Sequence, residues 1–221
     1  MLKSYVLRAG RFTDAQKRAY ASLAEKYIIP FNEAEIDLIK AFGRKAGVTL
    51  EIGFGMGIAT AVIAEANPGK DYVGVEVHRP GIGRLLWEIE KRSLSNIRIV
   101  EYDAAQVTEK MISASSLQAV HVFFPDPWPK KRHRKRRLIQ RPFTETLAQK
   151  LIPGGYLYMA TDWEDYALHA LEELSACSLL SNAYEGFAPP QPWRPKTKFE
   201  QKGLAKEHAI KELYFIRKKY D

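Results

Sequence analysis

The chain has 221 residues, of which 46% are hydrophobic and 11% aromatic, enough to bury one substantial core and too many for a chain that is disordered throughout. Its formal net charge of +8 favours a polyanionic partner. Residues 130–141 contain eight lysines and arginines and no acid, so this segment alone accounts for the excess. The single cysteine, Cys177, excludes an internal disulfide and a thiolate metal cluster.

The first residues and the lengths of the apolar runs indicate in which compartment to expect the protein. The first residues lack the apolar run of a signal peptide, and no stretch approaches the roughly 18 apolar residues that span a bilayer. We therefore expect a cytoplasmic protein without a membrane partner. We also expect residues 1–40 to form a basic N-terminal extension and residues 41–221 to form the core domain, with the basic segment 130–141 inside it.

Short apolar runs alternate with helical patterns along the core domain. The patterns predict strands at residues 48–52, 72–76, 97–100, 119–124, 156–160 and 212–216, and helices at 58–66, 79–94, 106–112, 137–151 and 163–175. Strands that alternate with crossovers of ten or more residues indicate a parallel sheet with helices on both faces. The predicted fold is therefore α/β and doubly wound.

Three glycines follow the first predicted strand: Gly53, Gly55 and Gly57. The dinucleotide pattern G-x-G-x-x-G would require its third glycine where this chain has Ile58. Glu51, just before the turn, disfavours a nearby diphosphate and suits a ligand that carries an amine or a cation. Two structural alternatives stay open here: a tight turn without a ligand, and a Glu51 that pairs with an arginine.

Two further acids follow the next two strands. Glu76 ends the second strand, where an acid can bond the hydroxyls of a ribose, and Asp103 follows the third, where a carboxylate can accept a bond from an adenine amino group. Acids after three strands, beside a turn without phosphate-binding spacing, predict S-adenosylmethionine, which has an adenosine and a sulfonium but no phosphate. For Asp103 a helix cap is the open alternative.

A proline-rich loop and then the basic segment follow the fourth strand. Three prolines hold Asp126 and Trp128 in a stiff, extended loop, which suits the positioning of a reactive group. A rigid turn with a capping Asp126 is the structural alternative, and Trp128 either stacks on a base or packs beneath the loop. The basic segment suits a nucleic-acid backbone, although such runs also serve as solvated localisation or membrane-surface signals.

At this point the sequence resembles a known family, the bacterial tRNA (guanine-N7-)-methyltransferases. The resemblance rests on FFPDPWPKKRH at 123–133, EIGFGMG at 51–57 and TKFEQKG at 197–203, and it extends from about Arg8 to the C-terminus. It implies a Rossmann-like S-adenosylmethionine-dependent methyltransferase fold with a mostly parallel seven-stranded sheet. It also implies methyl transfer to N7 of a guanine in the variable loop of tRNA. Methyl transfer needs no metal, and the scattered histidines offer no ligand cluster. No obligatory protein partner is inferred, and the sequence leaves monomer and homodimer open.

The residues and the resemblance together give a set of expected roles. Asp126 is the expected catalytic residue. Expected to bind the cofactor are Glu51, Gly53, Gly55, Glu76, Asp103 and Asp126. Expected to contact the tRNA are Lys130, Arg132, His133, Arg134, Lys135, Arg136, Arg137, Asp162, Thr197, Lys198, Phe199 and Glu200. Arg134 stands where relatives commonly have histidine, a difference that keeps the positive charge.

The chemistry of the acceptor limits what Asp126 has to do. N7 of guanine has an in-plane lone pair and no proton, so a general base is not obligatory, and we expect Asp126 to orient the ring and stabilise its developing charge, with Asp162 sharing the task. Two other functions stay open. One is a methyltransferase for another RNA or DNA acceptor, whose loop would read Asn/Asp-Pro-Pro-aromatic; the other is a non-catalytic RNA-binding module.

Overall fold

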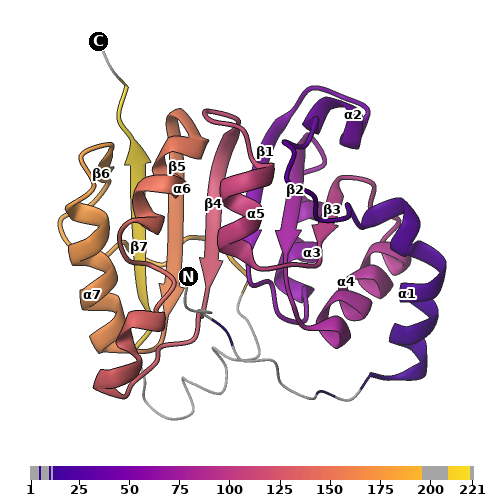
Figure 1. Ribbon diagram of the computed structural model, residues 1–221, viewed down its shortest axis with the longest axis horizontal. Coiled ribbons are helices and arrows are strands. Elements are labelled where there is room, and N and C mark those ends of the chain that lie inside the picture. Colours follow the sequence, from indigo (N-terminus) through magenta and orange to yellow (C-terminus); the bar gives the residue numbers. More distant parts are fainter. Residues whose placement is uncertain (1–4, 6–9, 11, 196–208, 220–221) are drawn as a thin grey trace. The chain divides into compact units, whose positions relative to one another are not determined.

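The computed structural model describes residues 5, 10, 12–195 and 209–219. The chain divides into two compact units, and each is considered by itself (Figure 1). The first unit comprises residues 7–113. The second comprises residues 1–6 and 114–221.

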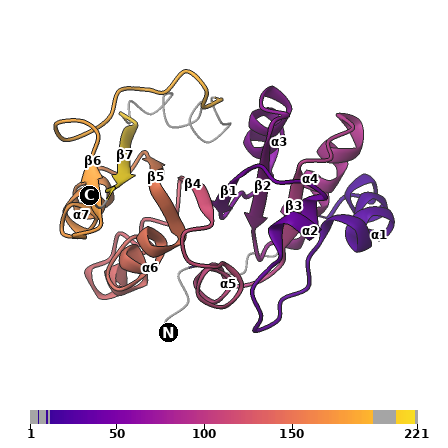
Figure 2. The same cartoon turned by 90° about the horizontal axis from the view of Figure 1, so that it is seen from above.

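The first unit is built on three parallel strands in the order β3-β2-β1. Figure 2 shows α3 and α4 on one side of these strands and α5 on the other. The elements of this core are β1 (Gly47–Ile52), α3 (Ile58–Ala66), β2 (Lys70–Val75), α4 (Arg79–Lys91), β3 (Ile97–Val100) and α5 (Ala104–Met111). Since parallel strands all point the same way, the turns after β1, β2 and β3 lie at one end of the unit.

Two helices precede this core, α1 (Asp14–Tyr27) and α2 (Leu38–Phe42), and neither was predicted. Thr13 caps α1: Gln16 donates its amide to the Thr13 hydroxyl at 3.4 Å, and Thr13 donates its own to the Gln16 side chain at 2.8 Å. This capping box is readable in the sequence and could have revealed the helix. The Tyr27 hydroxyl donates to the carbonyl of Leu94 at 3.0 Å, so α1 is fastened to the first unit. The predicted boundary at residue 40, between an N-terminal extension and the core domain, stays a prediction.

The second unit holds four strands in the order β4-β5-β7-β6. Here β4 and β5 are parallel, and β7 runs antiparallel to both of its neighbours. Figure 2 shows α6 and α7 on one side of these strands and the chain that follows β6 on the other. The elements are β4 (Leu117–Phe123), α6 (Phe143–Lys150), β5 (Leu151–Thr161), α7 (Glu164–Ser175), β6 (Leu180–Asn182) and β7 (Lys211–Arg217).

The described residues therefore contain seven strands, and every pair recorded among β1 to β5 is parallel, which agrees with the predicted α/β class.

The helix predicted at 137–151 is wrong at its start, because α6 begins only at Phe143, while residues 131–136 form a short 3₁₀ helix. Pro142 explains the late start, since inside a helix proline lacks the required amide and its ring clashes with the preceding turn. β6 was missed because three edge residues carry no readable alternation.

Candidate active site

The turn after β1 is built from glycines in left-handed conformations. Gly53, Gly55 and Gly57 have φ angles of 72°, 58° and 67°, which residues with a side chain rarely adopt. A Cβ placed on Gly53 or Gly55 would meet no described atom within 4 Å. The backbone of this turn is therefore open to close approach by a ligand.

Glu76, directly after β2, supports that turn. Its Oε2 accepts a hydrogen bond from the amide of Gly55 at 2.9 Å, and its Oε1 accepts from the amides of Val77 and His78 at 2.6 and 3.0 Å. A carboxylate offers about four acceptor positions, so three hydrogen bonds leave room for a ligand hydroxyl. The sequence predicted the ligand role of Glu76 but not its hold on the glycine turn.

Glu51 lies in the last part of β1 with only 2% of its surface exposed. Its Oε2 has no hydrogen-bond partner among the described residues, and no arginine in that part of the chain pairs with it. Burial raises the pKa of Glu51 to about 8, and the carboxylate of Glu76 adds to the rise. The nearby hydroxyl of Thr60 acts in the opposite direction, although the two groups do not reach good hydrogen-bond geometry. A buried carboxyl oxygen without a partner is costly to fold, and a ligand with a cationic group would supply the partner that the described residues do not provide to Oε2.

Asp103 caps α5. Its Oδ1 accepts a hydrogen bond from the amide of Gln106 at 3.1 Å, so the helix-cap alternative describes what the carboxylate does in the chain. The side chain is half-buried and its other oxygen keeps acceptor capacity. A role towards a ligand is compatible with this geometry and stays a prediction.

The loop that carries Asp126 lies in the second unit, between β4 and the 3₁₀ helix. Phe124 and Trp128, on either side of it, have φ angles of 51° and 46°, a left-handed conformation that costs a residue other than glycine about 1 kcal/mol or more. The Phe124 amide donates to the carbonyl of Ala160 on β5 at 2.8 Å, which fixes the start of the loop. Asp126 itself is half-buried.

Trp128 packs beneath the loop rather than standing open to a base. Its side chain is only 9% exposed. The Arg136 guanidinium lies over the indole ring at 3.9 Å from the centroid, and the His133 ring meets the indole edge-on at 5.9 Å. Of the two roles that the sequence left open for Trp128, the described structure therefore supports packing.

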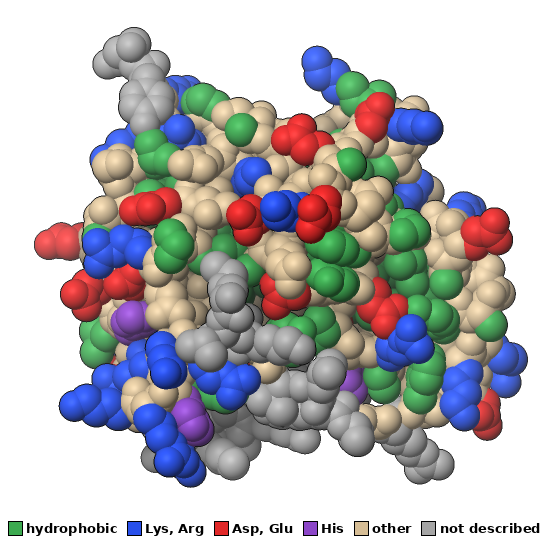
Figure 3. Space-filling model, viewed as in Figure 1, with side chains coloured by type: hydrophobic (Ala, Val, Ile, Leu, Met, Phe, Trp, Pro, Cys, Tyr) green, Lys and Arg blue, Asp and Glu red, His purple; other side chains and the backbone are tan. Residues whose placement is uncertain are grey.

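The cationic segment is exposed over most of its length. Figure 3 shows lysine and arginine side chains gathered beside histidine side chains at the lower left of the face in view. His133 is half-buried, and its pKa is lowered by desolvation and by the surrounding cations. The exposed cations of the segment are Lys130, Lys131, Arg132, Arg134, Lys135 and Arg141.

Arg137 differs from the cations before it, because only 1% of its side chain is exposed. Its Nε donates to the carbonyl of Pro127 at 3.0 Å, and its Nη2 donates to Oδ2 of Asp165 on α7. The predicted contact of Arg137 with RNA therefore competes with contacts inside the chain. Asp165 was not singled out from the sequence, and an acid in the first turn of a helix is a weak signal because capping alone accounts for it.

The remaining predicted residues are placed as follows. Asp162 is half-buried at the end of β5, where the amide of Trp163 donates to the Thr161 hydroxyl at 3.2 Å. Thr197, Lys198, Phe199 and Glu200 lie outside the described residues. The structure thus gathers Glu51, Gly53, Gly55, Glu76 and Asp103 in the first unit, and Asp126, Asp162 and the cations in the second.

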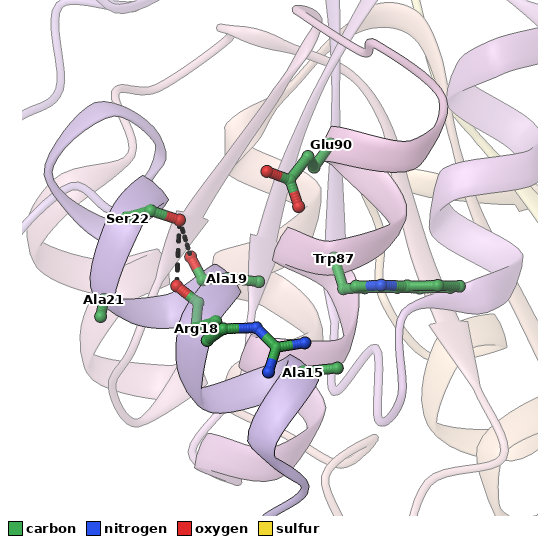
Figure 4. A pocket seen from close by; sticks show the side chains of 7 residues that line it. All are labelled: Ala15, Arg18, Ala19, Ala21, Ser22, Trp87 and Glu90. Carbon is green, nitrogen blue, oxygen red and sulfur yellow. Dashed lines mark hydrogen bonds between the residues drawn. The ribbon is translucent and has the colours of Figure 1, made fainter.

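The described residues contain no cluster of His, Cys, Asp and Glu that could hold a metal. Within the same ranges no helix is both long and apolar enough to cross a membrane. A shallow hollow between α1 and α4 is lined by Arg18, Trp87 and Glu90 with small residues of α1 (Figure 4). It contains none of the predicted site residues.

Solved structures that resemble the chain show which fold it has. The 16S rRNA methyltransferase KamB matches with a TM-score of 0.58 over 96% of this chain and 97% of its own, at 15% identity. A 16S rRNA (adenine(1408)-N(1))-methyltransferase with cosubstrate SAM, from Catenulisporales acidiphilia, matches with a TM-score of 0.53 over 81% of this chain and 89% of its own, at 15% identity. The fold is therefore the Rossmann-like methyltransferase fold, as predicted.

Sequence comparison identifies the family. Residues 45–213 match the model of a family described as putative methyltransferases. Proteins named tRNA (guanine-N(7)-)-methyltransferase are 53% identical in Nitrosomonas eutropha, over 98% of this chain and 96% of that protein, and 50% identical in Bordetella pertussis, over 98% of this chain and 85% of that protein. The chain belongs to the tRNA (guanine-N(7)-)-methyltransferase family and is an enzyme.

Proposed function

We propose that this protein transfers the methyl group of S-adenosylmethionine to N7 of a guanine in the variable loop of tRNA, in the cytoplasm. The observation that carries the proposal is the identity of about 50% over almost the whole chain with relatives named for this activity. The loop that carries Asp126 supports it, because Pro-Asp-Pro-Trp is not the Asn/Asp-Pro-Pro-aromatic sequence expected for methylation of an exocyclic amine.

The first unit fits S-adenosylmethionine in three respects. Oε2 of Glu51 is buried without a partner among the described residues, and this carboxyl suits an ammonium group. The glycine turn leaves its backbone open at Gly53 and Gly55, and Glu76 keeps acceptor capacity for ribose hydroxyls. Asp103 keeps an acceptor for an amino group. When bound, the cofactor supplies an electrophilic methyl group on a positively charged sulfur.

On the acceptor side, the lone pair on N7 forms the new bond to the methyl carbon, and the bonding pair of the broken carbon–sulfur bond stays on sulfur. No proton is lost from the base, and the guanine ring gains positive charge. Asp126 would accept hydrogen bonds from the N1 and N2 hydrogens of guanine to aim N7, and its charge would stabilise the ring as it becomes cationic. Asp162 would share that task.

In this proposal the exposed cations bind the phosphates of the tRNA. Lys130, Lys131, Arg132, Arg134 and Lys135 are exposed in the segment directly after the loop that carries Asp126. Phosphate contacts hold an RNA in register without reading its sequence. The segment Thr197 to Glu200 is proposed to contact the guanine, with Phe199 as a stacking partner.

Mass mapping of nucleosides tests the proposal directly. Unmodified tRNA is incubated with the protein and S-adenosylmethionine, digested and analysed for methylated nucleosides and their positions. The expected product is 7-methylguanosine in the variable loop. Methylation of another atom, or S-adenosylmethionine binding without any transfer, would overturn the proposal.

A further inference from the structure

Arg137 belongs to the cationic segment by sequence but not by position. Among the neighbouring cations Arg134 has 48% of its side chain exposed and Arg137 only 1%, although both pair with the same carboxylate of Asp165. A phosphate contact needs a group that RNA can reach. The guanidinium of Arg137 points into the second unit, so we expect its role to lie in contacts within that unit.

The contacts of Arg137 reach both the loop that carries Asp126 and the start of α7. Its Nε donates to the carbonyl of Pro127 at 3.0 Å. Its Nη1 donates to the carbonyl of Asp165 at 3.4 Å and its Nη2 to the carboxylate of the same residue. The guanidinium also lies over the ring of Tyr166, 5.0 Å from the centroid. One fork-shaped group thus joins the loop to the first turn of α7.

The Pro127 carbonyl is a sensitive point because of the residue that follows it. That carbonyl belongs to the peptide unit whose amide is that of Trp128, so the orientation of this one plane sets the φ of Trp128. The angle is 46°, which a tryptophan holds only when its surroundings compel it. A hydrogen bond from a buried, charged donor to this carbonyl resists rotation of the plane, and rotation would displace Asp126, two residues back.

Tyr166 strengthens the same attachment. Its hydroxyl accepts a hydrogen bond from the amide of Ile139 at 3.0 Å, and its side chain is fully buried. The residues on both sides of Arg137 are therefore fixed as well: the Arg137 amide donates to the carbonyl of Arg134 at 2.9 Å, and Ile139 is held by α7. The part of the segment from Arg137 to Ile139 is tied to α7, whereas Lys130, Lys131 and Arg132 at its beginning are exposed.

We propose that Arg137 is a positioning residue that holds the loop carrying Asp126 in its working conformation, rather than a contact to tRNA. This inference rests on the proposed function, in which Asp126 aims the guanine. Asp165 is the second residue of this arrangement, since its carboxylate pairs with the Arg137 guanidinium and so connects Arg137 to α7. The guanidinium lowers the pKa of the Asp165 carboxyl below its ordinary value.

The Arg137→Lys variant is the decisive test, because it keeps the charge but replaces the planar, fork-shaped guanidinium that bonds Pro127 and Asp165 through separate nitrogens by a single ammonium nitrogen. The positioning role predicts that kcat falls at least tenfold, while the Kd for tRNA changes less than twofold and its dependence on salt is unchanged. Arg141→Lys is the matched control, since Arg141 pairs with Glu173 of the same helix α7 while 51% of its own side chain is exposed. The loss of kcat should be at least fivefold smaller there.

A second measurement separates this inference from the proposed function. Hydrogen exchange of the free protein should be faster in Arg137→Lys across residues 124–140 and unchanged across β1 and α3. If the wild-type protein makes no 7-methylguanosine, the proposed function fails, whatever the exchange shows. Unchanged exchange in Arg137→Lys, full kcat in that variant, or a flatter salt dependence in Arg137→Gln would each overturn the positioning role.

Discussion

The amide of Gly55 donates a hydrogen bond to Oε2 of Glu76 at 2.9 Å, so the acid after β2 holds the glycine turn after β1. The same carboxylate accepts two further amides through its other oxygen. One side chain therefore shapes the turn and, in the proposed function, reads the ribose of the cofactor. The two roles share one group, and a substitution there should affect folding and ligand binding together.

Glu76→Gln tests this coupling. The amide group of glutamine replaces an acceptor with a donor, so at least one of the three backbone amides loses its partner, at a cost of about 1–3 kcal/mol in the free energy of unfolding. Cofactor affinity should fall at least tenfold. Denaturant unfolding and calorimetric titration with S-adenosylmethionine measure the two effects. Glu90→Gln, an exposed acid on α4, is the control, and wild-type affinity in Glu76→Gln would refute the assignment.

Asp126→Asn should lower the single-turnover methylation rate by about 10²–10³, the range for loss of one electrostatic stabiliser. Its amide keeps the size of the side chain, so the affinities for S-adenosylmethionine and tRNA should stay within a few fold of wild type. Glu185→Gln removes one exposed carboxylate from the same unit and should leave the rate unchanged. A wild-type rate in Asp126→Asn would show that the charge of Asp126 is not used.

The sequence predicted the strands and the acids at their ends well, because both depend on local pattern. Acids at the ends of parallel strands must lie at one end of the sheet, and the carboxylate of Glu76 is indeed close enough to raise the pKa of Glu51. The hydrogen bonds of Glu76 to the turn were not predicted, since they depend on the backbone geometry of glycines at positive φ.

The burial of Arg137 could not be predicted from the sequence. Charge counting treats every member of a cationic run alike, whereas burial of one arginine depends on a partner 28 residues away, Asp165. Trp128 is a similar case: whether it stacks on a base or packs beneath the loop depends on Arg136 and His133, which fold back over it in the 3₁₀ helix. Contacts of this kind follow from tertiary packing and leave no periodic signal.

The exposed cations should determine how tRNA binding depends on salt. If Lys131, Arg132 and Lys135 each contact a phosphate, replacing all three by glutamine should flatten the slope of log K against log salt by about 2–3. The matched control replaces Lys17, Arg18 and Lys91, three exposed cations of the first unit, and changes the net charge equally. Binding isotherms at several salt concentrations give the slopes. Equal changes in both triple variants would show that only net charge matters.

Glu51 should make both stability and cofactor binding depend on pH. Its pKa is about 8 in the folded protein against an ordinary value of 4.5. As pH rises, the unfolded chain therefore loses this proton before the folded protein does. The free energy of unfolding should fall between about pH 4.5 and pH 8, by up to about 1.4 kcal/mol per pH unit. Glu51→Gln cannot ionise, and its stability relative to wild type should grow across that window. An ammonium group bound beside Glu51 would favour the carboxylate, so binding of S-adenosylmethionine at pH 7 should release up to one proton. Titration calorimetry in buffers of different ionisation enthalpy counts that proton, and an equal release from Glu51→Gln would show that another group titrates.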